Sequence, residues 1–167
     1  MDRTLNKSVF ISVCGAIIII GATAALGRNF TVEESSQTSL RFTANFSADL
    51  HDLVVPTDGT EPPYRSFLVG VPIGATVKLD RVQVLHTAPV VTRNRLAQTA
   101  AAPGLAVISA PFKVRGRRLV TVRVYPVSGE TIATKIAVGL SFDGAVAGRG
   151  TVTPDPEFDR IFKAAVI

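Results

Sequence analysis

The sequence contains few of the residue types that build catalytic centres or cross-linked domains. Its 167 residues include one cysteine, two histidines and no tryptophan. The single cysteine, Cys14, lies within an apolar N-terminal run, so neither a disulfide framework nor a cysteine nucleophile is expected in the folded part of the chain. Tyr64 and Tyr125 are the only tyrosines, and with no tryptophan this composition disfavours a carbohydrate-binding surface.

The reactive side chains that remain have no spacing typical of a catalytic or metal site. His51 and His86 belong to no H-x-H or H-E-x-x-H motif, and no serine lies in a G-x-S-x-G turn. We therefore predict no catalytic residue, no metal ligand and no cofactor. The acidic loop from Asp49 to Glu61 offers the oxygen ligands that calcium prefers, but its spacing matches no calcium loop and favours a solvated loop.

The charge balance is moderately basic. The chain has 18 Lys and Arg against 13 Asp and Glu, a net charge of +5. This surplus suits an acidic partner but is too small to indicate a nucleic acid, and no nucleic-acid partner is expected. The length allows one domain of ordinary size.

The N-terminus has the three parts of a secretory signal peptide. Arg3 and Lys7 precede the uncharged run Val9 to Leu26. The small-residue triplet Ala22-Thr23-Ala24 lies near the end of this run. We predict a signal peptide over residues 1–24, cleaved after Ala24, and a secreted or cell-surface protein that meets a membrane only during export. The alternative is a retained anchor, because the run is close to the length that crosses a bilayer.

The rest of the chain is predicted to be all-β. Residues 25–37 are polar and short of aliphatic side chains, which predicts a flexible lead-in. From residue 38 onward, alternating apolar residues and Pro or Gly turns predict short strands and, over residues 38–167, an antiparallel β-sandwich. A change of apolar parity predicts a bulge near Asp80 and Arg81. The predicted strands cover residues 40–47, 66–71, 77–84, 105–110, 119–125 and 135–142.

Two further elements follow from the second half of the sequence. The strands at 119–125 and 135–142 are predicted to pair as a hairpin, with Gly129 free to adopt positive φ in the turn between them. Phe158, Ile161 and Phe162 have helical spacing after the N-cap candidate Asp155, which predicts a short C-terminal helix. Because so short a helix is marginal alone, it needs the sandwich or further protein to pack against.

One basic cluster is a candidate docking site. Lys113, Arg115, Arg117 and Arg118 lie within six residues. One interpretation is a charged strand edge that discourages aggregation. The other is docking of Arg115, Arg117 and Arg118 on the carboxylates of a partner protein.

The order of features around this cluster resembles the propeptide domain of the gingipain family, peptidase family C25. The matching segments are FKVRGRRLVTVRVYPV (112–127), a strand ending Leu140-Ser-Phe142, and PEFDRIF (156–162), within a similarity that spans residues 69–167. The resemblance implies an exported prodomain that assists folding of a cysteine endopeptidase and keeps it latent. Its partner would be the catalytic domain of the same precursor, and no position here matches that family's catalytic Cys and His. The alternative is a self-contained secreted β-sandwich that acts as a binding or adhesion module.

Overall fold

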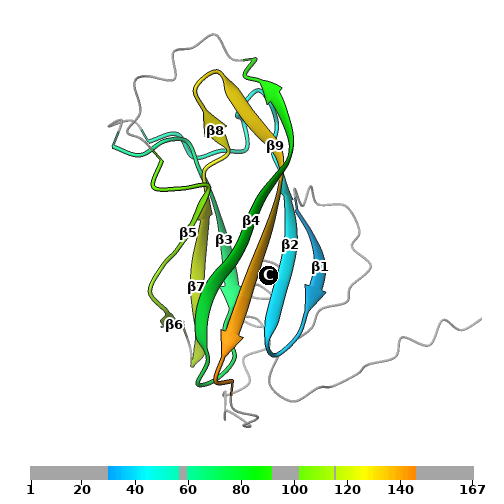
Figure 1. Cartoon of the computed structure of the whole chain (residues 1–167). Coiled ribbons are helices and arrows are strands. Elements are labelled where there is room, and N and C mark those ends of the chain that lie inside the picture. Colours follow the sequence, from blue (N-terminus) through cyan, green and yellow to red (C-terminus); the bar gives the residue numbers. More distant parts are fainter. Residues whose placement is uncertain (1–29, 57–59, 92–101, 115, 146–167) are drawn as a thin grey trace, which may run out of the picture.

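The computed structural model describes residues 30–56, 60–91, 102–114 and 116–145 (Figure 1). Within these ranges the chain is all-β, with antiparallel strands in two sheets and no helix, as predicted. Three predicted features lie outside the described residues: the signal peptide over residues 1–24, the C-terminal helix after Asp155, and the docking residue Arg115. None of the described segments forms a helix long and apolar enough to cross a membrane.

The first sheet has the strand order β1-β2-β9-β4, and the short strand β8 also pairs with β9. Its strands are β1 (Phe30–Ser35), β2 (Ser39–Asn45), β4 (Thr76–Pro89), β8 (Val127–Ser128) and β9 (Thr131–Asp143).

The second sheet has the strand order β3-β7-β5, and the short strand β6 pairs with β7 beyond the end of β5. Its strands are β3 (Arg65–Gly70), β5 (Ala106–Ile108), β6 (Phe112–Val114) and β7 (Arg117–Val124).

The core lies between the two sheets and is built from alternate side chains of both. Phe42 of β2 and Phe67 of β3 meet with ring centroids 5.2 Å apart, and both are buried. Val122 and Val138 come from the central strands of the two sheets and belong to the same cluster. Burying one such side chain contributes roughly 1.5–3 kcal/mol, so this shared core holds the layers together.

Several local predictions are confirmed. Strand β2 covers most of the segment with the clearest alternation, and β3, β7 and β9 overlap the strands predicted over residues 66–71, 119–125 and 135–142. The pairing of β4 with β9 shifts register between Leu79 and Arg81, the predicted bulge position. The shift lets Val77 and Val82 both pack against the core despite their different parity. Gly129 has φ of +59° in the turn before β9.

The predicted hairpin between the strands at 119–125 and 135–142 is wrong. These strands, β7 and β9, lie in different sheets. Each is already flanked on both edges, β7 by β3 and β5, and β9 by β2 and β4, so neither has a free backbone edge for the other. The intervening segment instead folds back on β9, where Val127 pairs with Ile132 to form a tight β8–β9 hairpin.

The flexible lead-in predicted over residues 25–37 is also corrected, because residues 30–35 form strand β1. Phe30 explains the difference: its ring lies 5.9 Å from that of Phe67 and 6.5 Å from that of Phe42, in edge-on geometry. The polar residues of β1, which make the segment look like a flexible lead-in, also form contacts with β2. Glu34 pairs with Arg41 at 3.1 Å across β1 and β2.

Candidate docking surface

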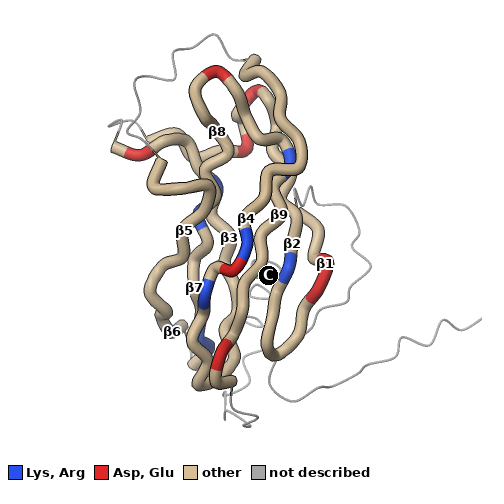
Figure 2. The backbone as a smooth tube through the Cα atoms, viewed as in Figure 1, with Lys and Arg blue, Asp and Glu red and all other residues tan. Residues whose placement is uncertain are grey.

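The two sheets differ sharply in charge (Figure 2). The strands of the first sheet balance four Lys or Arg residues with four acidic ones: Arg41, Lys78, Arg81 and Lys135 against Glu33, Glu34, Asp80 and Asp143. The strands of the second sheet hold five basic residues and no acidic one: Arg65, Lys113, Arg117, Arg118 and Arg123. The second sheet is therefore the basic layer of the sandwich.

Acidic side chains of the first sheet engage partners on the same sheet. Besides the Glu34–Arg41 pair, Asp143 bonds Lys78 at 2.5 Å and Asp80 accepts a hydrogen bond from Ser141 at 2.9 Å. Two of the four positive charges of this layer, Arg41 and Lys78, are thus paired with carboxylates in place. A charged partner would have to displace existing bonds to dock here.

At the upper end of the second sheet in Figure 1, a loop between β2 and β3 supplies the missing acids. Asp52 bonds Arg65 at 3.1 Å, and the Asp52 side chain is only 7% exposed. Glu61 bonds Arg123 at 2.8 Å in a more exposed pair. Both ion pairs lie at the same end, because Arg65 is directly opposite Val124 in the β3–β7 ladder.

Arg123 is held from several sides. Its guanidinium carbon lies 4.9 Å from the centre of the Tyr64 ring, a cation–π geometry. A hydrogen bond with Tyr125 raises the pKa of Arg123 above its already high ordinary value. Arg123 is therefore a positively charged side chain that is held in place and already paired with Glu61.

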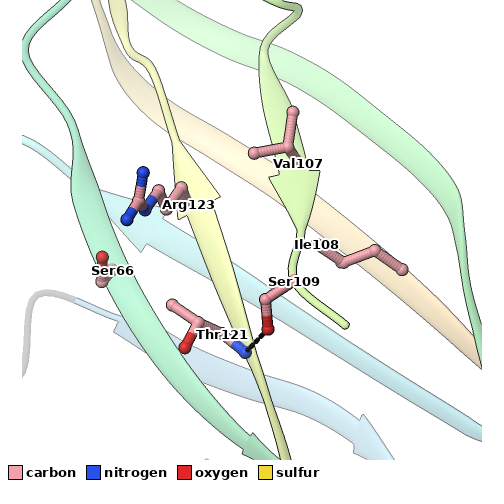
Figure 3. A pocket seen from close by; sticks show the side chains of 6 residues that line it. All are labelled: Ser66, Val107, Ile108, Ser109, Thr121 and Arg123. Carbon is pink, nitrogen blue, oxygen red and sulfur yellow. Dashed lines mark hydrogen bonds between the residues drawn. The ribbon is translucent and has the colours of Figure 1, made fainter. Parts of the chain in front are cut away.

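An open depression of about 590 Å³ lies beside this arginine, between β3, β7 and β5 (Figure 3). It is lined by Ser66, Val107, Ile108, Ser109, Thr121 and Arg123. The Ser109 hydroxyl is used structurally, because it accepts the Thr121 amide at 2.9 Å and donates to the Ala110 carbonyl at 3.0 Å. No imidazole or carboxylate lines the depression, so its hydroxyls have no general base beside them.

The two histidines lie elsewhere in the described part of the chain. His51 bonds Asp49 in the loop between β2 and β3, and this contact raises the pKa of His51 and lowers that of Asp49 to about 2. His86 lies on β4, opposite Lys135 of the first sheet. The described residues therefore bring no imidazole to a serine that a base would need to activate.

In the described part of the acidic loop from Asp49 to Glu61, the carboxylates of Asp49, Asp52 and Glu61 bond three different partners, His51, Arg65 and Arg123. Among residues 30–56, 60–91, 102–114 and 116–145, no three His, Cys, Asp or Glu side chains converge on a possible metal position.

The lower end of the second sheet holds the predicted basic cluster. Lys113 is opposite Arg118 and Val114 is opposite Arg117 in the β6–β7 ladder. Arg117 and Arg118 are half-buried, whereas Lys113 is exposed. Arg118 also has an internal role, since it donates a hydrogen bond to the Ala75 carbonyl at 2.5 Å.

Of the three arginines predicted to dock, Arg117 and Arg118 are consecutive residues of β7, so their side chains lie on opposite faces of the strand. Arg115 lies outside the described residues. The sequence prediction left out Lys113 and its neighbour Phe112, although both lie in the same run. Phe112 is 38% exposed, a signal that only the fold reveals.

Protein-family models and curated proteins contain no match to this sequence. Solved structures do match. A chain of the complex of Porphyromonas gingivalis RgpB pro- and mature domains aligns with a TM-score of 0.54 and 17% identity, over 83% of this chain and 96% of that one. This chain has a gingipain propeptide-like fold. The resemblance seen in the sequence is therefore confirmed at the level of the fold.

A second match is a structure described as giving insight into the zymogenic latency of gingipain K from Porphyromonas gingivalis. It has a TM-score of 0.40 and 16% identity, over 74% of this chain and 97% of that chain. The fold assignment rests on the RgpB complex.

Proposed function

We propose that this chain is the exported prodomain of a C25-like cysteine endopeptidase. It docks on the catalytic domain of the same precursor, assists its folding and keeps it latent. The observation that carries this proposal is the alignment of the two-sheet fold with nearly the whole of one chain of the RgpB complex. The chain itself is not an enzyme in this proposal, and the catalytic cysteine and histidine belong to its partner.

The charge distribution supports a docking role. The strands of the second sheet carry five basic residues and no acidic residue, and Lys113 among them is exposed. Such groups pair well with carboxylates on a protein surface, and complementary charge speeds association and fixes orientation. A prodomain of this kind needs a preformed surface and no reactive centre.

Docking explains how the same contact serves folding and latency. A partner that binds only the folded catalytic domain stabilises it, by about 2.7 kcal/mol when the effective concentration is a hundred times the Kd. A flexible connection within one precursor gives effective concentrations of about 1 mM, so a Kd near 10 μM is sufficient. The predicted signal peptide over residues 1–24 would deliver the precursor to an extracellular or cell-surface location.

The test combines binding, inhibition and refolding. The full chain is titrated into the C25-type catalytic domain from the same organism while peptide hydrolysis is measured, and the denatured catalytic domain is refolded with and without the chain. We expect saturable inhibition and a higher refolding yield. A chain that neither binds nor inhibits would overturn the proposal, and binding of glycans instead would favour the adhesion module.

A further inference from the structure

The two sheets have unequal widths, and β1 is the strand of the first sheet that has no counterpart among the described strands. The first sheet has the order β1-β2-β9-β4, and the second has β3-β7-β5. Phe42 of β2 packs on Phe67 of β3 at one side of the sandwich, and β4 approaches β5 at the other. By their order, the central strands β9 and β7 face each other. Strand β1 therefore extends past β3 (Figure 1).

The inner face of β1 is correspondingly open. In the β1–β2 ladder Phe30 is opposite Ala44, which is fully buried in the core. Val32 is opposite Phe42, which is also fully buried. Residues directly opposite each other share a face, so Phe30 and Val32 both point to the core side of the first sheet. Phe30 leans on Phe67 and is half-buried, whereas Val32 is 42% exposed. Two inward-pointing apolar side chains thus face the position beside β3.

The backbone of β3 has an unpaired edge at the same position. The amide of Val71, directly after β3, donates to the Arg118 carbonyl of β7. Odd-numbered residues of β3 therefore direct their backbone groups toward β7, and even-numbered ones away from it. Tyr64 agrees with this, because its amide and carbonyl both bond Val54 of the preceding loop. Beyond that bridge, three residues have outward amides and carbonyls that no described segment pairs with (Figure 3): Ser66, Leu68 and Gly70.

The open edge of β3 also lacks the features that keep other strand edges from pairing. The edge strand β1 has a bulge at Glu33, and the β4 ladder shifts register at three places. Strand β5 is only three residues long. In contrast, β3 pairs with β7 over its whole length without a shift, and Ser66 to Gly70 includes no charged residue and no proline. An edge of this kind accepts an added strand.

We propose that an extended segment of the peptidase domain binds here as a strand, paired with the outer edge of β3 and opposite β1. The inference rests on the proposed function and deepens it, because it names the contact through which the prodomain docks. Backbone hydrogen bonds to Ser66, Leu68 and Gly70 provide affinity. Apolar side chains at alternate positions of the segment bury Val32 and the exposed part of Phe30. About five residues of extended chain, about 16 Å, cover the open part of β3.

A second copy of this chain does not fit the position. Antiparallel pairing of two β3 strands is symmetric about a two-fold axis normal to the sheet, so the second sheets of the two copies would join edge to edge. Each β1 would then occupy the place of the other copy's β2, which packs on that copy's β3. A single strand with no sheet stacked on it has no such clash.

The helix predicted after Asp155 is a weaker candidate for the same position. Its backbone amides and carbonyls would bond within the helix, so it would cover Phe30 and Val32 but leave the edge of β3 unpaired. An extended segment satisfies both the backbone edge and the apolar face. The peptidase domain of the same precursor would present such a segment at high effective concentration.

The experiment compares two pairs of matched variants of the full chain in binding to the C25-type catalytic domain. Val32→Asp is paired with Thr31→Asp, because both residues are exposed but Thr31 is opposite Thr43 on the outer face. Ser66→Pro, which removes an outward amide, is paired with Ser66→Ala, which keeps it. We expect Val32→Asp to weaken the Kd by about tenfold or more, since it buries an unpaired carboxylate, and Ser66→Pro by about tenfold. Each control should stay within about twofold.

Residue-resolved hydrogen exchange on the unmodified chain guards against misfolded variants. In the chain alone, the amides of Phe67 and Val69 should exchange slowly because they face β7, whereas those of Ser66 and Leu68 should exchange rapidly. Binding of the catalytic domain should slow the exchange of the second pair by about tenfold or more.

The outcomes separate this inference from the proposed function. Saturable binding with unchanged exchange at Ser66 and Leu68, or with equal Kd values for Val32→Asp and Thr31→Asp, overturns the inference and leaves the proposed function standing. Slow exchange of these two amides in the chain alone also overturns it, and the molecular mass in solution then tells a second copy from a segment of the same chain. Absence of wild-type binding overturns both.

Discussion

Arg118 on β7 donates a hydrogen bond to the backbone carbonyl of Ala75, 43 positions earlier in the chain. Ala75 is fully buried and directly precedes β4, so this bond connects the second sheet to the segment where the chain crosses into the first. The neighbouring amide of Val71 reinforces the junction by donating to the Arg118 carbonyl at 2.9 Å. One arginine of the basic cluster therefore stabilises the fold as well as adding charge to the surface.

Replacing Arg118 should accordingly cost stability. Hydrogen bonds to charged groups contribute about 1.5–3 kcal/mol, and partial exposure of Arg118 reduces this, so we expect Arg118→Ala to lower the free energy of unfolding by about 1–2 kcal/mol. Lys113→Ala, on the opposite and exposed position of the ladder, should change it by less than about 0.5 kcal/mol. Urea unfolding monitored by tyrosine fluorescence measures the free energy of unfolding of both variants. Equal losses would show that the hydrogen bond to Ala75 adds nothing to stability.

The two ion pairs at the upper end should differ in their effect on stability. Asp52 is almost fully buried against Arg65, whereas Glu61 and Arg123 are each more than a third exposed. Removing one partner of a buried pair leaves an uncompensated charge, which typically costs about 3 kcal/mol or more, whereas exposed pairs contribute about 0–1 kcal/mol. We expect Asp52→Asn to lower the thermal midpoint by several degrees and Glu61→Gln to leave it nearly unchanged. The reverse order in a thermal melt would contradict this assignment.

Structural features that depend on neighbouring residues could be predicted from the sequence, whereas features that depend on distant strands could not. Alternation within a strand and the parity change at Asp80 depend on neighbouring residues only, so β2 and the bulge could be predicted. Partner choice depends on which edges other strands leave free. For that reason the sequence predicts a hairpin of β7 and β9, although these strands lie in separate sheets.

The same reasoning applies to the candidate surface. The basic run that contains Arg117 and Arg118 is visible in the sequence, because its charges are contiguous. The 38% exposure of Phe112 is not visible in the sequence, because it depends on where β6 pairs with β7. The charge difference between the layers likewise appears only when each strand is assigned to its sheet.

The exposed Asp49–His51 pair gives a pH-dependent signal. Hydrogen bonding to His51 lowers the pKa of Asp49 from its ordinary 3.8 to about 2, and the same contact raises the pKa of His51 above 6.5. The small stabilisation from His51 is therefore complete below pH 6.5 and is lost as pH rises through the higher folded pKa. That from Asp49 is present above pH 3.8 and is lost as pH falls toward 2. NMR titration of the His51 ring should show a raised midpoint that returns to about 6.5 in Asp49→Asn. An unchanged midpoint in that variant would exclude the contact in solution.

Strand β1 offers a test of how the first described strand is attached to the sandwich. The polar composition of residues 30–35 predicts flexibility, yet Phe30 contacts the rings of Phe42 and Phe67 and so joins the two layers. Because Phe30 is half-buried, its truncation should cost less than the 3–5 kcal/mol of a fully buried phenylalanine, and we expect about 2 kcal/mol for Phe30→Ala. Val32→Ala serves as control, since Val32 on the same strand is 42% exposed and its loss should cost less than about 0.5 kcal/mol. If chemical denaturation finds the two variants equally stable, β1 is a weakly attached edge. If only Phe30→Ala lowers the free energy of unfolding, the aromatic contact, and not the polar ladder with β2, attaches the strand to the sandwich.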